Sequence, residues 1–247
     1  MKQLMLFPLL ITLAFNSLLF GQIQEDSLFR GQDSIDLPLL PENVKLYQVE
    51  NQEIKRIALV CPGNLDISMM ESEMISRMVA KGTQVYLLQS GDRVVADQNN
   101  SSRVRFAVEA ETISSVLEVV RMEYKIQPIS IIGFYQDVSS VFDVLVQSEE
   151  IQQAIVVEGF PQIKPAFLAR IQCDVYGYYS GQNKNVMQRL SYLKRYMQAN
   201  RKTFKTYIFE EADFGFMNQG SPLDTNFPED SPRRELIDLL VGHLSDF

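Results

Sequence analysis

The sequence has few of the residues on which common catalytic and metal sites depend. Its 247 residues include one histidine, two cysteines and no tryptophan. Two cysteines exclude a disulfide scaffold and a four-cysteine zinc site, and one imidazole argues against a transition-metal centre. Neither G-x-G-x-x-G nor G-x-x-x-x-G-K-[ST] occurs at the predicted strand ends, which argues against a phosphate-cradling loop. We therefore expect no cofactor and no metal.

Positive charge is also scarce. The chain has 23 Lys and Arg against 31 Asp and Glu, a formal net charge of −8. An acidic chain without basic runs argues against nucleic acid or anionic lipid as its main partner. Hydrophobic residues make up 46% of the sequence, which is enough for a full core.

The first 21 residues have the pattern of a secretory signal peptide. Lys2 precedes an uncharged, mostly apolar stretch at residues 4–20, and Gly21 supplies a small residue before a cleavage point. We expect an exported protein, periplasmic or secreted, with no membrane span after cleavage. An uncleaved anchor is the alternative, because the stretch approaches the roughly 20 residues that cross a bilayer.

The remaining chain divides into a polar lead-in, residues 22–50, and one domain, residues 51–247. The lead-in could end in an edge strand near residues 46–49. Beyond it, short apolar runs alternate with helical patterns, and the runs lie at residues 57–61, 85–88, 129–132, 154–157, 174–179 and 206–209. Strict alternation of this kind predicts an α/β fold with a doubly wound, mostly parallel sheet.

Ligands of open parallel sheets bind at the carboxyl ends of the strands. Aromatic residues gather at the ends predicted here, and they are Phe134, Tyr135, Phe160, Tyr178, Tyr179, Phe214 and Phe216. They either fill the region as core or line a site for an apolar or planar ligand, with hydroxyl groups from Tyr135 and Ser180.

Four segments carry a resemblance to a known family. Residues 129–136, followed at once by a helix, look like a strand, a nucleophile turn and a helix. Gly177 lies near the end of a later strand, residues 212–217 read A-D-F-G-F-M, and Ser231 begins a closing helix. In this order the segments resemble the α/β-hydrolase fold, and within it the dienelactone hydrolase family, over about residues 55–247. The A-D-F-G-F-M segment is similar to that family's A-x-H-G-F-M loop.

The catalytic positions implied by this resemblance are all altered. Tyr135 stands where the nucleophile is expected, and Asp137 replaces the second glycine of the G-x-nucleophile-x-G turn. Ser180 stands in place of the acid, and Phe214 stands in place of the histidine. A phenol has a pKa near 10 and stays protonated at neutral pH, and Phe214 cannot accept a proton. We therefore expect a degenerate triad and no catalytic residues.

No other residue replaces the missing groups in an obvious way. His243 falls on the inward stripe of the last predicted helix, where packing against the sheet explains it. Cys61 ends the first core strand and is either a small buried hydrophobe or a reactive thiol. We expect no disulfide between Cys61 and Cys173, since their strands are not predicted to be neighbours.

The sequence thus favours a non-hydrolytic protein that binds a small apolar or aromatic ligand or a protein partner. The predicted binding crevice consists of Gly63, Tyr135, Gln136, Phe160, Tyr179, Ser180 and Phe214. Two alternatives stay open: an active esterase or peptidase that uses Cys61 or Tyr135, and a purely structural interaction module of the cell envelope.

Overall fold

The computed structural model describes the greater part of residues 44–245, and all structural statements below concern those residues. The described ranges are 44–49, 53–62, 69–90, 92–97, 100–105, 107–125, 127–182, 184–212 and 231–245. The predicted crevice residues Gly63 and Phe214 lie outside these ranges, as do the predicted signal peptide and most of the lead-in.

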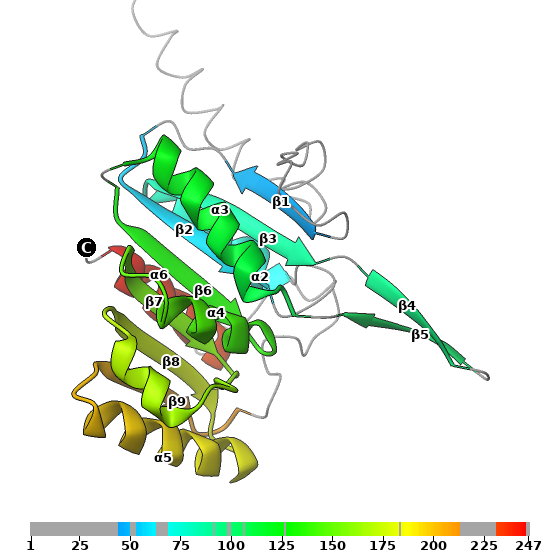
Figure 1. The fold of residues 1–247 in the computed structure, drawn as a ribbon, viewed down its shortest axis with the longest axis vertical. Helices are drawn as coiled ribbons and strands as arrows, with labels where there is room; N and C mark the ends of the chain where they lie inside the picture. The colour runs from blue at the N-terminus through cyan, green and yellow to red at the C-terminus, as the bar shows by residue number, and fades with distance from the viewer. Residues whose placement is uncertain are drawn as a thin grey trace, which may run out of the picture. The chain divides into compact units, whose positions relative to one another are not determined.

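Seven strands form the main sheet in the order β1-β3-β2-β6-β7-β8-β9, shown in Figure 1. Its strands are β1 (Val44–Val49), β2 (Arg56–Cys61), β3 (Thr83–Ser90), β6 (Ile129–Phe134), β7 (Ile151–Val157), β8 (Asp174–Ser180) and β9 (Phe204–Phe209). β1 pairs antiparallel with β3 at one edge, and every other pairing is parallel. The predicted mostly parallel sheet is therefore confirmed, and the six predicted apolar runs are its parallel strands.

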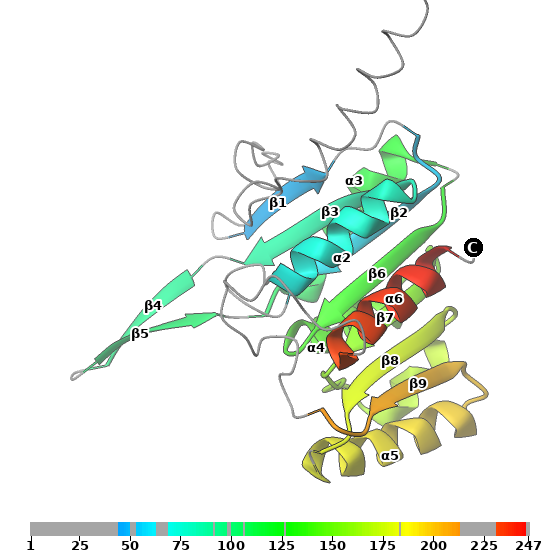
Figure 2. The same ribbon diagram turned by 180° about the vertical axis from the view of Figure 1, so that it is seen from behind.

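Helices cover both faces of the sheet, as Figures 1 and 2 show from opposite sides. The helices are α2 (Met69–Ala80), α3 (Ala110–Glu123), α4 (Asp137–Leu145), α5 (Lys184–Ala199) and α6 (Pro232–Ser245). α3 and α4 lie side by side on one face, and α2 and α6 lie side by side on the other. The central strands are buried on both faces, which explains why their sequences are continuous apolar runs.

Two features were not predicted from the sequence. Residues 92–105, which carry no continuous apolar run, form an antiparallel hairpin of β4 (Asp92–Asp97) and β5 (Asn100–Arg105) outside the main sheet. A 3₁₀ helix, η1 (Pro165–Arg170), follows β7. Within the described residues, no helix is long and apolar enough to cross a membrane.

Close packing between β6 and α4 fixes the turn that joins them. At Gly133, a Cβ atom would lie 2.7 Å from Cγ2 of Val141, so α4 can pack this closely only because residue 133 lacks a side chain. Phe142 and Val138 of α4 are fully buried against the sheet. The strand and the helix therefore hold the intervening residues, Tyr135 and Gln136, at the carboxyl edge of the sheet.

Candidate functional site

The turn between β6 and α4 has the backbone expected of a nucleophile turn. Tyr135 adopts φ 49°, a left-handed conformation that non-glycine residues adopt only when the surroundings impose it. Its N–H donates to the carbonyl oxygen of Val157 at 2.9 Å, which ties the turn to the end of β7. The tight geometry is thus retained while the side chain it presents is a phenol.

The turn from β7 also approaches very closely. Gly159 follows β7, and a Cβ atom there would lie 2.2 Å from the carbonyl oxygen of Tyr135 and 2.4 Å from the side chain of Val138. Glu158, immediately before it, also has a positive φ of 52°. Two unusual backbone conformations therefore meet at neighbouring strand ends.

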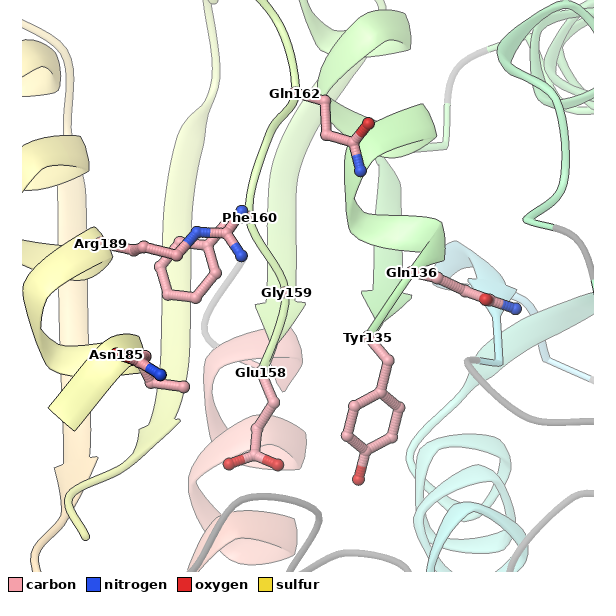
Figure 3. A pocket seen from close by; sticks show the side chains of 9 residues that line it. Tyr135, Gln136, Glu158, Gly159, Phe160, Gln162, Asn185 and Arg189 are labelled. Atoms are coloured by element: carbon pink, nitrogen blue, oxygen red, sulfur yellow. The ribbon is translucent and has the colours of Figure 1, made fainter. Parts of the chain in front are cut away.

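A cavity of about 440 Å³ opens beside these two turns, and Figure 3 shows its side chains. Residues from three segments contribute: the β6–α4 turn, the chain that leaves β7, and the first two turns of α5. The lining residues are Tyr135, Gln136, Glu158, Gly159, Phe160, Gln162, Asn185, Val186 and Arg189. A cavity of this size falls within the range of small-molecule sites.

Tyr135 and Glu158 lie next to each other at the carboxyl ends of their strands, with their polar ends directed the same way (Figure 3). Burial raises the pKa of the Tyr135 hydroxyl well above its ordinary value, and the nearby carboxylates of Glu158 and Glu71 raise it further, while Arg233 acts in the opposite direction. The phenol therefore stays neutral at physiological pH. In this state it can donate a hydrogen bond, but it is a poor nucleophile.

The carboxylate of Glu158 is part of the protein interior. Only 2% of the residue is exposed, and Oε1 accepts a hydrogen bond from the backbone N–H of Ser180 at 3.1 Å. Ser180 is itself fully buried, and within the described part of the chain its Oγ has no hydrogen-bond partner. Ser180 therefore holds the Glu158 carboxylate through its backbone N–H and does not itself line the cavity.

Phe160 has both of its ring faces covered. The ring of Tyr179 is stacked on one side, with centroids 5.1 Å apart, and the guanidinium carbon of Arg189 lies 4.5 Å from the Phe160 centroid. Tyr179 is fully buried, and its hydroxyl donates to the carbonyl oxygen of Gly159 at 3.2 Å. The edge of the Phe160 ring is therefore the part that a ligand can contact. Tyr179 packs against this ring and is not itself accessible.

The predicted crevice residues thus occupy different places. Tyr135, Gln136 and Phe160 line the cavity, and Tyr179 and Ser180 form a buried layer next to it. Sequence reasoning did not assign Glu158, Gln162, Asn185, Val186 or Arg189 to the site. Glu158 directly follows a predicted strand, so its position was a usable signal. Nothing in the helical pattern of α5 distinguishes Asn185 or Arg189 as site residues.

Asp137, which replaces the second glycine of the expected turn, is completely buried at the start of α4. Its Oδ1 accepts a hydrogen bond from the backbone N–H of Val108 at 3.0 Å. Val108 lies just before α3, so this carboxylate links the beginnings of α3 and α4. This hydrogen bond has a structural role, because it joins two segments of the backbone.

His243 lies on the other face of the sheet, with α6. Its Nδ1 is 2.5 Å from the hydroxyl of Tyr178, and its Nε2 is 2.9 Å from the hydroxyl of Tyr207. Tyr178 and Tyr207 pair across β8 and β9, and their rings stack with centroids 5.1 Å apart. Adjacent strand residues point to opposite faces, so Tyr178 faces α6 while Tyr179 faces Phe160. Both imidazole nitrogens therefore have partners far from the β6–α4 turn.

The two cysteines are buried free thiols. Cys61 is fully buried at the end of β2 and does not line the cavity. Burial raises the pKa of the Cys173 thiol to about 12, so this residue is not a thiolate at neutral pH. No group of three His, Cys, Asp or Glu side chains in the described ranges is placed to hold a metal ion.

Comparison by sequence finds no matching family profile and no matching curated protein. Comparison by structure finds many similar folds. A dienelactone hydrolase from Anabaena variabilis aligns with a TM-score of 0.62 at 12% identity, covering 85% of this chain and 94% of that one. A thermostable carboxyl esterase from Bacillus coagulans also gives 0.62, at 9% identity, with 86% and 97% covered. An alpha-beta serine hydrolase homologue from Coxiella burnetii gives 0.59 at 16% identity, with 86% and 96% covered.

Proposed function

Because the chain has the α/β-hydrolase fold, we propose that it is an exported member of this fold that has lost hydrolytic chemistry and binds a small ligand beside Tyr135. The observation that carries the proposal is the side chain at the retained nucleophile turn. The backbone there keeps φ 49°, but the group it presents is a phenol with a raised pKa.

The position of the only histidine supports the loss of catalysis. A nucleophile of this class needs a base within hydrogen-bond reach and a third group that orients the base. Both ring nitrogens of His243 lie within hydrogen-bond distance of the hydroxyls of Tyr178 and Tyr207, which argues against a role as the base for Tyr135. Glu158 lies beside Tyr135, but a carboxylate is too weak a base to remove a proton from a phenol of raised pKa.

The cavity lining supports a ligand with a largely apolar body and a hydrogen-bond acceptor. Val186 and the edge of Phe160 offer apolar surface, and Arg189 and Gln162 offer hydrogen-bond donors in the cavity lining. A carbonyl or carboxylate group on the ligand suits these donors. The purely structural module is a weaker alternative, because tight packing of the aromatic residues would leave no cavity of about 440 Å³.

One observation favours the rival function, an active hydrolase of unconventional type. A strained turn at Tyr135 costs free energy, and strain of this kind is concentrated at active sites. Turnover of p-nitrophenyl acetate separates the two functions. We expect no steady-state turnover above that of the Tyr135→Phe variant. Turnover that survives repurification, that is abolished by Tyr135→Phe and that is kept by the exposed control Tyr192→Phe would establish the rival.

Export is proposed from residues 1–21 alone. Their charged start and uncharged apolar stretch fit a secretory signal, and Gly21 suits the cleavage point. Mass spectrometry of the protein recovered from an exporting host checks this, and a chain beginning at Gln22 is the expected result. A chain that keeps residues 1–21 and sediments with membranes would instead support an uncleaved anchor.

A further inference from the structure

Positive charge is concentrated in one part of this acidic protein. Residues 175–209, which span most of β8, all of α5 and all of β9, contain seven Lys and Arg and no Asp or Glu. The other 16 cations share the rest of the chain with all 31 carboxylates. The net negative charge of the whole chain argues against anionic partners. One segment of the chain nevertheless carries a net positive charge.

Five of the seven cations of this segment are exposed. The exposed ones are Lys184, Arg189, Arg195, Arg201 and Lys205. Within the described residues none of the seven cations of the segment takes part in an ion pair. Arg189, Arg195 and Lys205 contact aromatic rings instead. Such contacts leave the positive charge uncompensated, so the surface attracts anions.

Two tyrosines lie among these cations on the outer face of α5. Tyr192 is 51% exposed and Tyr196 is 38% exposed, and they are two of four large apolar or aromatic side chains exposed in the described structure. The guanidinium carbon of Arg195 lies 5.2 Å from one ring centroid and 5.8 Å from the other. We call this face, centred on Lys184, Tyr192, Arg195 and Tyr196, the α5 ridge. It runs along the β9 side of the sheet, as both ribbon views show.

The composition and length of the α5 ridge distinguish among anionic partners. Its cations are spread over the whole of a 16-residue helix, roughly 24 Å long, and continue to Lys205. An extended array of cations suits a partner surface that carries many anions better than it suits a single small anion. Exposed tyrosines between cations match the headgroup layer of a bilayer, where amphipathic rings are favoured. The export proposed above, on which this one argument rests, would moreover bring the chain to a membrane.

We propose that the α5 ridge is a docking surface for a bilayer that contains anionic phospholipids. Headgroup phosphates meet Lys184, Arg195 and their neighbouring cations, and the rings of Tyr192 and Tyr196 lie among the headgroups. Because Arg189 belongs both to this basic segment and to the cavity rim, docking places the opening of the cavity near the membrane surface.

Partitioning of the full chain onto lipid vesicles tests the proposal. The measured quantity is the ratio of binding to phosphatidylglycerol–phosphatidylcholine vesicles over binding to pure phosphatidylcholine vesicles. Residues 1–21, if present, contribute equally to wild type and to the variants below, so the comparison of their ratios does not depend on this segment. We expect the ratio to be well above one and to fall with added salt. The double variant Lys184→Glu/Arg195→Glu should lower it by about 30-fold or more, because the loss of two cations near an anionic surface alone gives about 30-fold and the two added carboxylates are repelled.

The double variant Lys81→Glu/Lys125→Glu is the matched control, because it changes the net charge equally at two exposed residues away from α5. It should keep most of the anionic preference. An equal loss in both variants would overturn the proposal in favour of a non-specific effect of net charge. A wild-type ratio near one would overturn it as well. Binding to soluble polyglutamate without any preference for anionic vesicles would do the same and would assign the ridge to an acidic protein.

Discussion

Two regions of this protein that contain buried titratable groups, the cavity and the α6 face of the sheet, differ in how those groups are used. Beside the β6–α4 turn, Tyr135 and Glu158 lie at a cavity. On the α6 face, His243 lies between the hydroxyls of Tyr178 and Tyr207, and its backbone oxygen accepts from Nε2 of Gln153 at 3.3 Å. The cavity can hold a ligand but contains no histidine. The only histidine of the sequence lies on the α6 face, packed among tyrosines.

If the proposed function is right, this difference explains how a hydrolase architecture can exist without hydrolytic chemistry. The backbone of the turn is fixed by packing, through Gly133 and Gly159, and does not depend on which side chain Tyr135 presents. The histidine contributes to the stability of the α6 face through its contacts with tyrosines. Substitutions in the cavity should therefore change mainly ligand binding, and substitutions on the α6 face should change mainly the free energy of unfolding. The exception is a substitution that introduces a steric clash with the backbone of the cavity turns.

Two glycines provide the largest expected contrast. Gly159→Ala places a Cβ atom 2.2 Å from the backbone oxygen of Tyr135, a clash that a side-chain rotation cannot relieve. We expect a loss of about 3 kcal/mol or more in the free energy of unfolding, measured by urea denaturation. Gly242→Ala on α6 meets nothing within 4 Å and should stabilise the helix by about 0.5–1 kcal/mol. Similar effects at the two positions would refute the close packing of the two turns.

His243→Ala should have the next largest effect. It leaves the fully buried hydroxyl of Tyr178 without this partner and removes ring contacts with Tyr176 and Tyr207. We expect a loss of about 2–3 kcal/mol in unfolding free energy, against about 1 kcal/mol or less for Tyr135→Phe. Ligand binding at the cavity should be unchanged in folded His243→Ala. If this variant were as stable as wild type, the structural role of the imidazole would be wrong.

Alkaline pH should weaken both regions. Burial raises the pKa of Cys173 to about 12 and holds the pKa values of Tyr135 and Tyr178 above their ordinary range. The unfolded chain then releases these protons at lower pH than the folded one. Stability from the thiol is present below about pH 8.5 and is lost as pH rises toward 12, at up to about 1.4 kcal/mol per pH unit. The tyrosines add to the loss above about pH 10.

Urea midpoints at several pH values measure this loss, and Cys173→Ala isolates its first part. The variant should show a flatter profile than wild type between about pH 8.5 and 10. A wild-type midpoint that is constant up to pH 10 would mean that Cys173 is less shielded than its position at the start of β8 indicates.

The smallest expected effect concerns the cavity rim. 1-Anilinonaphthalene-8-sulfonate has an apolar aromatic body and an anionic acceptor, so it can probe the proposed ligand class. Arg189→Ala should weaken its binding to the folded protein by about tenfold, measured by fluorescence titration. Arg170→Ala is the matched control, since Arg170 also lies over a phenylalanine ring, that of Phe167, but does not line the cavity. Equal losses would show that the dye does not report on the cavity.

The sheet could be predicted because its strands are buried on both faces, and a continuous apolar run such as that of β6 is the direct result. The hairpin of β4 and β5 was missed, because a two-stranded ribbon outside the core needs no apolar run. The position of Tyr135 followed from the order of strand, turn and helix. The placement of Glu158 and Arg189 at the same cavity did not, because it depends on which strands are neighbours and on where α5 begins.

The partners of His243 were also beyond sequence reasoning. Its place on an inward helical stripe was visible, but the pairing of Tyr178 with Tyr207 depends on the register between β8 and β9. The alternation of side chains along β8 explains why Tyr178 and Tyr179, neighbours in sequence, face opposite sides of the sheet. Hydrogen bonds formed across such distances leave no local pattern in the chain.

Intact-protein mass spectrometry after incubation with a fluorophosphonate tests the central claim most directly. The reagent forms a covalent adduct with an activated nucleophile at the carboxyl edge of a hydrolase sheet. The account predicts no stoichiometric adduct on the folded protein, and no difference between wild type and Tyr135→Phe. A single adduct that peptide mapping places at Tyr135, and that Tyr135→Phe removes, would contradict it.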